Sequence, residues 1–516
     1  MEYAVAVFDV GMTNKKVTVF DDTLKRLDMT HKNFTPRKAS AGGREFEVHD
    51  LAGIKDFFLG ELQKFAAMYP IKAVAVTTHG ATFVCLDEAG EVCAPCVLYT
   101  HEPGEAFHRA FYTKVGGRDT LQRTTFTPPF SAMINAAKGI FFLQTYLPDE
   151  FARTKTILNY PSYWGYVLSG VCGAEPTSIG CHTYLWDHAK GVYSGVTDKL
   201  GIRGLLPENY RNSYETLGVI RPRIARETGL SPDTIVTMGI HDSNASLLPY
   251  LVKEKAGDFV LNSTGTWCVL MKPGETLDYE PGDIGNVVFF NQSALRKPVK
   301  TAIFLGGMEL DSYITRYQEI NGTATFPPYD PAAFNAVHRE NDTFLLPEIV
   351  AGSGQFAKTR AGILEKGTFY PFAEITPGHH PEIIRQPERF WALVDTSLVI
   401  QTLAALDRAG RKNGDRVFTE GGFRRNRGYN ALLSFALPDN EALLTNLNEA
   451  TSFGAAMTAI MAINAMATPV GTRDALDALD PGLVNIEYLP CDAEEFPFFE
   501  RYRQQWLTHA SRIASS

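Results

Sequence analysis

The sequence has no run of 18 apolar residues and no basic leader followed by an apolar stretch, so it predicts neither a membrane-spanning helix nor a secretory signal. Its seven cysteines are odd in number and scattered over 516 residues, which is not the pattern of a disulfide framework. The net charge of −9 comes without a stripe of Lys and Arg, and this argues against nucleic-acid binding. We therefore expect a cytoplasmic protein with no membrane or nucleic-acid partner.

Several nucleotide- and metal-binding patterns are also missing. No G-x-x-x-x-G-K-[ST] run occurs, which argues against a P-loop architecture. Cys93 and Cys96 have the C-x-x-C spacing, but no second Cys/His pair lies at zinc-finger distance, so we interpret them as reduced thiols near a turn. No heptad repeat indicates an oligomer.

The chain is long enough for two or more domains, and apolar strands alternate with helical patterns along it, as in α/β domains with mixed sheets. A strand–turn–strand unit at residues 3–20 recurs at residues 259–271. One repeat at this distance predicts two related domains that face each other. We expect domains at 1–252 and 253–470, with a C-terminal extension at 471–516.

The first hairpin could bind an anion. The apolar strand at residues 3–8 leads to Asp9, and Gly11 allows a tight turn whose N–H groups can face a phosphate. Thr13 and Asn14 offer hydrogen bonds, Lys16 offers a positive charge, and Asp9 could hold Mg²⁺ through water. An ordinary hairpin turn would contain the same residue types, so the hairpin alone leaves both interpretations open.

The second hairpin has hydroxyls and a glycine, Ser263-Thr264-Gly265-Thr266, between two apolar strands. Two such loops from two domains could hold one polyphosphate from both sides.

Asp242 follows a predicted strand at 234–238 and precedes a predicted helix that contains residues 244–251. A carboxylate in this place can be the N-cap of the helix or a catalytic base that the helix dipole keeps ionised, and the motif does not separate the two roles. After a strand at 416–419, the glycine pair Gly421-Gly422 allows the backbone to approach a flat ligand closely.

In this order, the motifs between residues 3 and 465 resemble those of the FGGY family of carbohydrate kinases. The first hairpin is similar to the family's first phosphate motif in its L-fuculokinase form, and residues 262–267 are similar to the second in the Gly-Thr-Trp form typical of deoxyketose kinases. The resemblance implies two RNase H-like domains of the actin-like ATPase fold around a central cleft. It also implies ATP and Mg²⁺ as cofactors and a small sugar as substrate, and a homodimer is an expectation at the level of the family.

The resemblance assigns roles to individual residues. Asp242 would be the catalytic base and contact the sugar, and Asp9 would bind Mg²⁺. His79, in the strand and turn of the sugar site, would contact substrate, and so could Tyr99 and His101. The phosphate ligands would be Gly11, Thr13, Asn14, Lys16, Gly265 and Thr266. The adenosine ligands would be Gly421, Gly422, Asn426 and Gly454.

Three segments depart from the family pattern near the sugar site or its lid, at residues 138–141, 175–178 and 392–395. They affect the choice of sugar more than the reaction. We expect a ketose such as L-fuculose, with L-rhamnulose, another ketose or a polyol as alternatives. Two alternatives of another class are a regulatory ATPase with the actin-like fold and a sugar sensor without catalysis.

Overall fold

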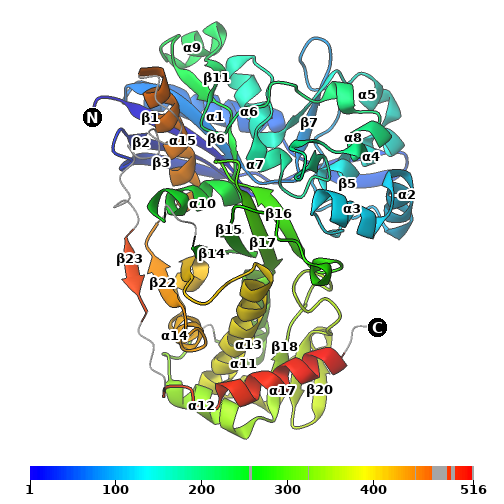
Figure 1. Cartoon of the computed structure of the whole chain (residues 1–516), viewed down its shortest axis with the longest axis vertical. Coiled ribbons are helices and arrows are strands. Elements are labelled where there is room, and N and C mark those ends of the chain that lie inside the picture. Colours follow the sequence, from blue (N-terminus) through cyan, green and yellow to red (C-terminus); the bar gives the residue numbers. More distant parts are fainter. Residues whose placement is uncertain (255–257, 324, 448, 468–484, 490–493, 514–516) are drawn as a thin grey trace.

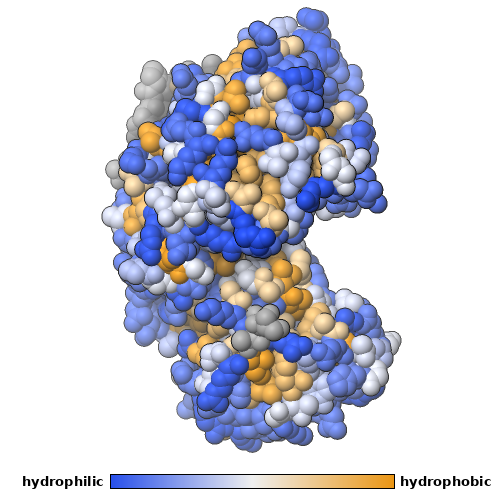
Figure 2. All heavy atoms as spheres, turned by 90° about the vertical axis from the view of Figure 1, so that its right-hand side faces the viewer, coloured by the Kyte–Doolittle hydropathy of each residue, from blue (hydrophilic) through white to orange (hydrophobic). Residues whose placement is uncertain are grey.

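The computed structural model has two lobes stacked along its long axis (Figure 1). It describes residues 1–254, 258–323, 325–447, 449–467, 485–489 and 494–513. Figure 2 shows the surface hollowed between the upper and lower lobes, with hydrophobic residues exposed around the hollow. Each lobe is built on a mixed sheet with helices packed against it, which confirms the predicted α/β class.

The first lobe contains the sheet β11-β12-β6-β1-β2-β3. Its antiparallel members β1, β2 and β3 are joined by hairpins, and β6 and β12 run parallel to β1. Its strands are β1 Ala4–Val10, β2 Asn14–Asp21, β3 Arg26–Asn33, β6 Ile71–Thr78, β11 Thr216–Val219 and β12 Ile235–Thr237, with the short β13 Ile240–His241 beside β6.

The second lobe repeats this order in the sheet β16-β17-β15-β14-β21-β22-β23. Here β14, β15 and β17 are antiparallel, and β21 and β22 run parallel to β14. Its strands are β14 Phe259–Thr264, β15 Cys268–Pro273, β16 Val288–Gln292, β17 Pro298–Phe304, β21 Arg416–Gly421, β22 Glu441–Thr445 and β23 Ile486–Tyr488. The repeated hairpin predicted from the sequence is therefore the centre of two sheets with the same topology.

Two helices that are about 200 residues apart in the chain, α10 and α15, lie between the sheets (Figure 1). Helix α15, Ala450–Ala467, packs on the first sheet against Val5 and Ala73, although it follows the second sheet in sequence. Helix α10, Asp242–Lys253, packs on the second sheet through Leu247 and Tyr250. The two segments of the chain thus cover each other's sheets.

The remaining helices cover the outer faces or build an insertion beside the first sheet. The first lobe has α1 Leu51–Ala66, α6 Tyr160–Ser169 and α9 Pro222–Thr228. The insertion contains α2 Glu105–Val115, α3 Arg118–Thr125, α4 Ala136–Tyr146, α5 Pro148–Ala152, α7 Pro176–Ile179 and α8 Gly195–Lys199, with β4 Arg37–Ala41, β5 Arg44–Val48, β7 Phe83–Leu86, β8 Thr156–Asn159, β9 Trp186–Asp187 and β10 Val192–Tyr193. The second lobe has α11 Gly306–Asn321, α12 Pro331–Glu340, α13 Pro387–Arg408, α14 Arg427–Phe435 and α17 Phe499–Arg512, with β18 Thr343–Leu346, β19 Gly362–Glu365 and β20 Thr368–Pro371.

Helix α13 is the one helix, among the described residues, that is long and apolar enough to cross a membrane by length and composition. Its residues are largely buried in the main core of the second lobe, where α17 also packs through Tyr502 and Trp506. The predicted extension 471–516 therefore contributes a helix to this core, and its residues 471–484, 490–493 and 514–516 lie outside the described part of the chain.

Two local predictions need correction. The apolar periodicity of residues 131–145 predicts a helix over that whole range, but α4 begins only at Ala136, because Ala132 has a φ of +48° that interrupts helical geometry. Asp242, considered as the N-cap of α10, is its first helical residue, and His241 is the N-cap.

Candidate active site between the lobes

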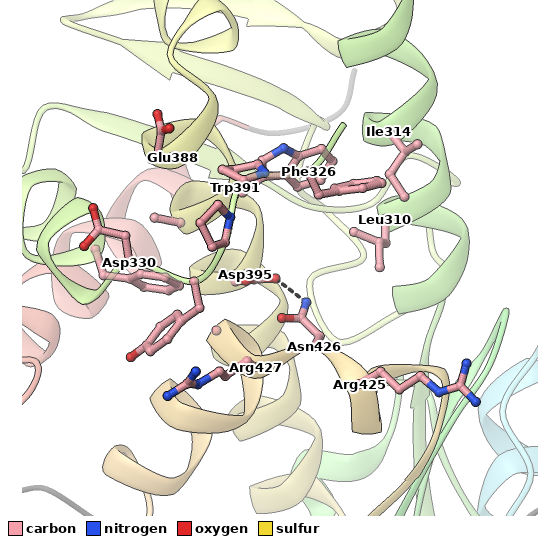
Figure 3. Close-up of a pocket in the computed structure, with 16 residues that line it drawn as sticks. Leu310, Ile314, Phe326, Asp330, Glu388, Trp391, Asp395, Arg425, Asn426 and Arg427 are labelled. Atoms are coloured by element: carbon pink, nitrogen blue, oxygen red, sulfur yellow. Dashed lines mark hydrogen bonds between the residues drawn. The ribbon is translucent and has the colours of Figure 1, made fainter. Parts of the chain in front are cut away.

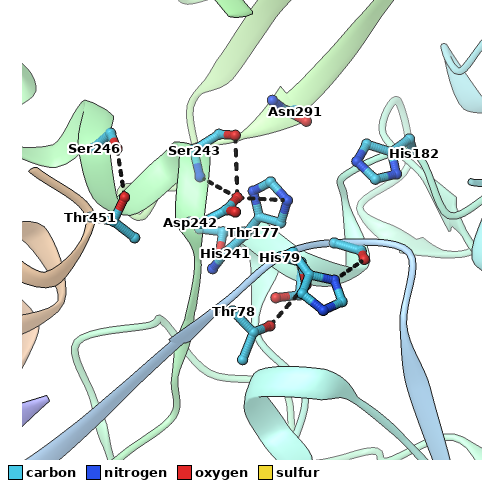
Figure 4. A network of polar contacts seen from close by, with 12 residues as sticks. Thr78, His79, Thr177, His182, His241, Asp242, Ser243, Ser246, Asn291 and Thr451 are labelled. Atoms are coloured by element: carbon cyan, nitrogen blue, oxygen red, sulfur yellow. Dashed lines mark hydrogen bonds and ion pairs between the residues drawn. The ribbon is translucent and has the colours of Figure 1, made fainter. Parts of the chain in front are cut away.

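Asp242 lies at the start of α10, where β13 ends. Its Oδ1 accepts hydrogen bonds from the backbone N–H of Ser243 at 2.7 Å and from the Ser243 hydroxyl at 3.3 Å (Figure 4). The side chain is 35% exposed and faces a pocket. Burial of the carboxyl raises its pKa to about 6, and the hydrogen bond from the Ser243 backbone opposes that shift. Asp242 is therefore mainly ionised at neutral pH and still a usable base.

Three histidines lie close to this carboxylate. His241 Nε2 is 3.4 Å from Asp242 Oδ1, and the rings of His241 and His182 are 5.9 Å apart. Burial lowers the pKa of both to about 4 and lowers the pKa of His79 further below its usual value. All three imidazoles are therefore neutral at physiological pH and able to hydrogen-bond to uncharged hydroxyls.

These side chains line a cavity of about 310 Å³ between the lobes. It brings Asp242 together with His79, Tyr99 and Thr266, four of the residues predicted from the sequence. The other lining residues are Gly80, Phe130, Ile134, Cys181, His182, His241 and Ser243 from the first lobe and Trp267, Val269, Phe289, Asn291 and Ile303 from the second. A few polar groups set among apolar and aromatic side chains are typical of a site for a small polar ligand.

His101, also predicted to contact substrate, lies elsewhere. It lines a separate surface pocket with Phe46 and Glu102, and its ring contacts Phe46 and Phe142. By contrast, the predicted Tyr99 lies beside His79, with ring centroids 5.5 Å apart. Burial, followed by the charge of Asp242, raises the Tyr99 pKa to about 12, so its hydroxyl stays protonated.

A second carboxylate, Asp9, stands near Asp242 at the end of β1. Ser452, on α15, donates a hydrogen bond to Asp9 Oδ2 at 2.9 Å. Burial raises the Asp9 pKa to about 6, Lys16 opposes this shift, and Asp242 and Glu449 add to it. Two carboxylates in one cleft are the hard oxygen donors that Mg²⁺ prefers, so this donor set fits a hydrated Mg²⁺ held by Asp9.

The predicted phosphate ligand Lys16 forms an ion pair with Glu449, just before α15. Its neighbour Lys15 points the other way and is almost completely buried. Lys15 Nζ donates to the carbonyls of Gly11 and Met12 at 2.7 and 2.6 Å. Because these carbonyls are drawn inward, Lys15 stabilises the loop that contains Gly11, Thr13 and Asn14. Burial lowers the pKa of Lys15 to about 8.

The second hairpin loop is fixed by close backbone contacts. A Cβ at Gly307, in the first turn of α11, would lie 2.0 Å from the Gly265 carbonyl. The Thr264 hydroxyl donates to the Glu420 carbonyl and accepts from the N–H of Phe423. Gly421 has a φ of +81°, and a Cβ there would lie 2.0 Å from the Thr264 carbonyl. Gly421 therefore allows β21 to end against β14.

A further pocket of about 390 Å³ lies in the second lobe (Figure 3). Of the predicted adenosine ligands, Asn426 lines it, whereas Gly421, Gly422 and Gly454 do not. Asn426 donates to Asp395 Oδ1 at 2.5 Å and accepts from the N–H of Tyr429 as the N-cap of α14. Burial raises the Asp395 pKa to about 7. Phe326 and Trp391 provide aromatic surface for a flat ring.

Gly454, predicted from the resemblance as an adenosine ligand, lies against α10 in the structure. A Cβ on Gly454 would lie 1.8 Å from the carbonyl oxygen of Ala245 on α10. Its lack of a side chain allows α15 and α10 to touch through their backbones.

Several lining residues had no motif to identify them. His182 belongs to an irregular segment, and Asn291 lies at the end of a strand that was not predicted. Asp395 was visible only as a departure from the family pattern, and the second lobe's Trp391 had no signal at all.

Comparison with known proteins gives two matches to family profiles. Residues 4–249 match the N-terminal domain of the FGGY family of carbohydrate kinases, and residues 256–469 match the C-terminal domain of FGGY carbohydrate kinases. A rhamnulokinase from Enterococcus faecalis is 24% identical over 227 residues, which are 44% of this chain and 44% of that protein. The chain thus spans less than half the length of this relative.

Two solved structures share the fold along almost the whole chain. A carbohydrate kinase from Novosphingobium aromaticivorans has a TM-score of 0.77 with 24% identity, covering 99% of both chains. A gluconate kinase from Lactobacillus acidophilus has a TM-score of 0.79 with 13% identity, covering 99% of this chain and 98% of that one. At these identities the likeness shows the two-lobed kinase fold.

Proposed function

The chain belongs to the FGGY family of carbohydrate kinases, and on this premise we propose that it transfers the γ-phosphoryl group of ATP to a hydroxyl of a small sugar. One observation carries the proposal most directly. The inter-lobe cavity combines Asp242, a ring of neutral hydrogen-bonding side chains and the hairpin loop at Thr266. A sugar hydroxyl beside Asp242 would thus face the loop that resembles a phosphate motif.

In this mechanism Asp242 accepts the proton of the attacking hydroxyl, a contribution worth roughly 10²- to 10⁴-fold in rate. His79, Tyr99 and Asn291 orient the sugar. Phosphoryl transfer requires positioning and charge neutralisation more than covalent chemistry. Backbone N–H groups of the Gly11 and Gly265 loops, with Thr13, Asn14 and Thr266, supply the positioning from both lobes.

Asp9 would hold Mg²⁺, which neutralises phosphate charge when bound. The adenine ring would lie against Phe326 and Trp391, near Asn426. Gly421 and Gly422 act on this site by setting the path of β21. Lys16 must exchange Glu449 for a phosphate oxygen, so ATP binding would break the ion pair that joins β2 to the start of α15.

For the sugar we propose a ketose, with L-fuculose or L-rhamnulose first. Asn14 and the Gly265-Thr266-Trp267 motif resemble those of deoxyketose kinases, and the curated relatives are rhamnulokinases. The cavity's volume of about 310 Å³ suits a monosaccharide. We further propose that the protein acts in the cytoplasm; a homodimer stays a prediction.

A coupled ADP-release screen over ketoses, aldoses and polyols tests the proposal. We expect ADP release that depends on one sugar and on Mg²⁺. Hydrolysis of ATP at the same rate without sugar would instead indicate a regulatory ATPase. Sugar binding by calorimetry without any turnover would indicate a sensor.

A further inference from the structure

A thiol and two imidazoles converge at one wall of the inter-lobe cavity. Cys181, His182 and His241 each offer one donor atom, and these atoms all lie within 4.8 Å of one another. None of the three belongs to the phosphate or magnesium positions described above. Sulfur and imidazole nitrogen are the donors of tetrahedral Zn²⁺ sites, whereas Mg²⁺ selects oxygen.

The hydrogen bonding of His182 presents the ring in a metal-binding form. Its Nδ1 lies 3.1 Å from the carbonyl oxygen of Ile134. A carbonyl can only accept, so Nδ1 carries the proton and Nε2 keeps its lone pair. Metal-binding histidines are commonly oriented in this way, with the second ring nitrogen donating to a carbonyl or carboxylate.

Gly80 defines the space that the two rings share. A Cβ at Gly80 would lie 2.7 Å from His241 Nε2 and 3.0 Å from His182 Nε2. Both Nε2 atoms therefore face the same small volume, which the absence of a side chain keeps open. Asp242 Oδ1 is 3.4 Å from His241 Nε2 and adjoins this volume.

The backbone of His182 is in the left-handed region, with a φ of +38°. This conformation is uncommon for a residue other than glycine and is often retained at functional sites. In an extended strand, consecutive side chains point to opposite faces. The left-handed turn instead brings the donor atoms of Cys181 and His182 to one side, as their distance shows.

We propose that Cys181, His182 and His241 bind a cation of the Zn²⁺ class, with Asp242 as the fourth donor, and that the bound cation excludes sugar. The Cys181 thiol loses its proton to solvent as the sulfur–metal bond forms, so binding tightens as the pH rises. The metal then occupies the cavity and engages the carboxylate that would act as base. The inhibitory consequence rests on the proposed kinase function, whereas the binding site does not.

Titration of the metal-free, full-length protein with Co²⁺ tests the site without any assay of activity. We expect a thiolate-to-Co²⁺ charge-transfer band in the near ultraviolet that saturates at one equivalent and disappears when Zn²⁺ is added. Cys181→Ser should lose the band, and His182→Gln should weaken Co²⁺ binding at least tenfold. Two remote matched variants, Cys172→Ser and His379→Gln, should keep both the band and the affinity.

Absence of the band in the wild type, or its persistence in Cys181→Ser, would overturn the site. Circular dichroism of each variant establishes that it is folded, and the half-buried His182 provides a test that does not alter the buried thiol. In the ADP-release assay, Zn²⁺ should inhibit competitively with sugar, and Cys181→Ser should be resistant. An active kinase that shows no band would refute the site alone, and a protein that shows the band but never turns over would refute the kinase alone.

Discussion

The two central hairpins share one topology and differ in chemistry. Residues 9–16 of the first include Asp9, Lys15 and Lys16, whereas the corresponding residues 263–270 of the second have no charged side chain. At the same place in the register, Asp9 pairs with Thr77, but Ser263 pairs with Glu420. One sheet therefore supplies charge to the cleft, and the other supplies backbone and hydroxyl groups.

The carboxylate at this place in the second sheet makes its hydrogen bond in the protein interior. Glu420 is buried, and the Tyr250 hydroxyl donates to it at 2.8 Å. Burial raises its pKa to about 7. Glu420 is thus engaged in an interior hydrogen bond, whereas Asp9 interacts with Asp242 at the candidate active site.

The largest expected effect comes from removing the charge of the first lobe's base. Asp242→Asn should lower kcat by roughly 10²- to 10⁴-fold because the hydroxyl loses its proton acceptor. Affinity for ATP, measured by calorimetry, should change little. The exposed Asp233 provides the control Asp233→Asn, which should leave kcat unchanged. Turnover near that of the wild type in Asp242→Asn would contradict the assignment.

The next effect tests the backbone contacts of the second lobe. Gly421→Ala should destabilise the protein by about 1–3 kcal/mol, because its φ of +81° and ψ of −146° lie in a region that only glycine adopts readily, and by a further ~1–3 kcal/mol for overpacking against Thr264. Gly367 has a φ of +85° with nothing within 4 Å of its Cβ position, so Gly367→Ala measures the cost of a positive φ without a close contact. Equal losses in urea unfolding of the two variants would contradict the close contact.

The kinase activity should also depend on pH, because the base Asp242 belongs to the first lobe's carboxylates. Because Asp242 has a pKa of about 6, kcat/KM should fall about tenfold per unit as the pH decreases below 6. The Asp9→Asn variant, although impaired, should keep this acid limb. Loss of the limb in that variant would assign the titration to Asp9 instead.

The free energy of unfolding should also depend on pH, and the raised pKa of Asp9 determines the direction of that dependence. Burial raises the Asp9 pKa from 3.8 to about 6, so its contribution to stability is fully present below pH 3.8 and is lost as the pH rises through 6. Asp9→Asn should therefore be stabilising relative to wild type at pH 7 and less so at pH 4. Thermal unfolding at the two pH values measures this; a larger gain at pH 4 would contradict the sign.

The smallest effect concerns the ion pair between the lobes. Glu449→Gln frees Lys16 for phosphate and should lower KM for ATP up to about fivefold, because partly exposed pairs contribute at most about 1 kcal/mol. Glu275→Gln breaks the exposed pair with Lys297 and serves as the matched control. A raised KM would indicate that Glu449 supports nucleotide binding.

Local sequence patterns were sufficient for the hairpins and for the setting of Asp242. Alternating strands and glycine turns are determined by neighbouring residues, so both hairpins were predicted where the structure has them. The contact between Ser452 and Asp9 spans 443 positions, and no local pattern contains such a pairing. His182 was missed because its position depends on an irregular loop.

The glycines show a further limit of prediction from sequence. A small residue at the start of a helix can permit close approach of a ligand or of another helix, and the sequence signal is the same for both. At Gly454 the neighbour is α10. At Gly421 it is Thr264. Asn426 lines a pocket with its polar side chain, and its role as an adenosine ligand stays a prediction.

The contact between Gly454 and Ala245 places a pivot point between the two helices, about which any rocking of the lobes would turn. Two helices that touch backbone to backbone can rock, and atoms close to the pivot point sweep the shortest arcs. Asp242 lies three residues before Ala245, and Ser452, which holds Asp9, lies two residues before Gly454. Rocking about this contact would therefore move the rim of the hollow more than it would move the two carboxylates.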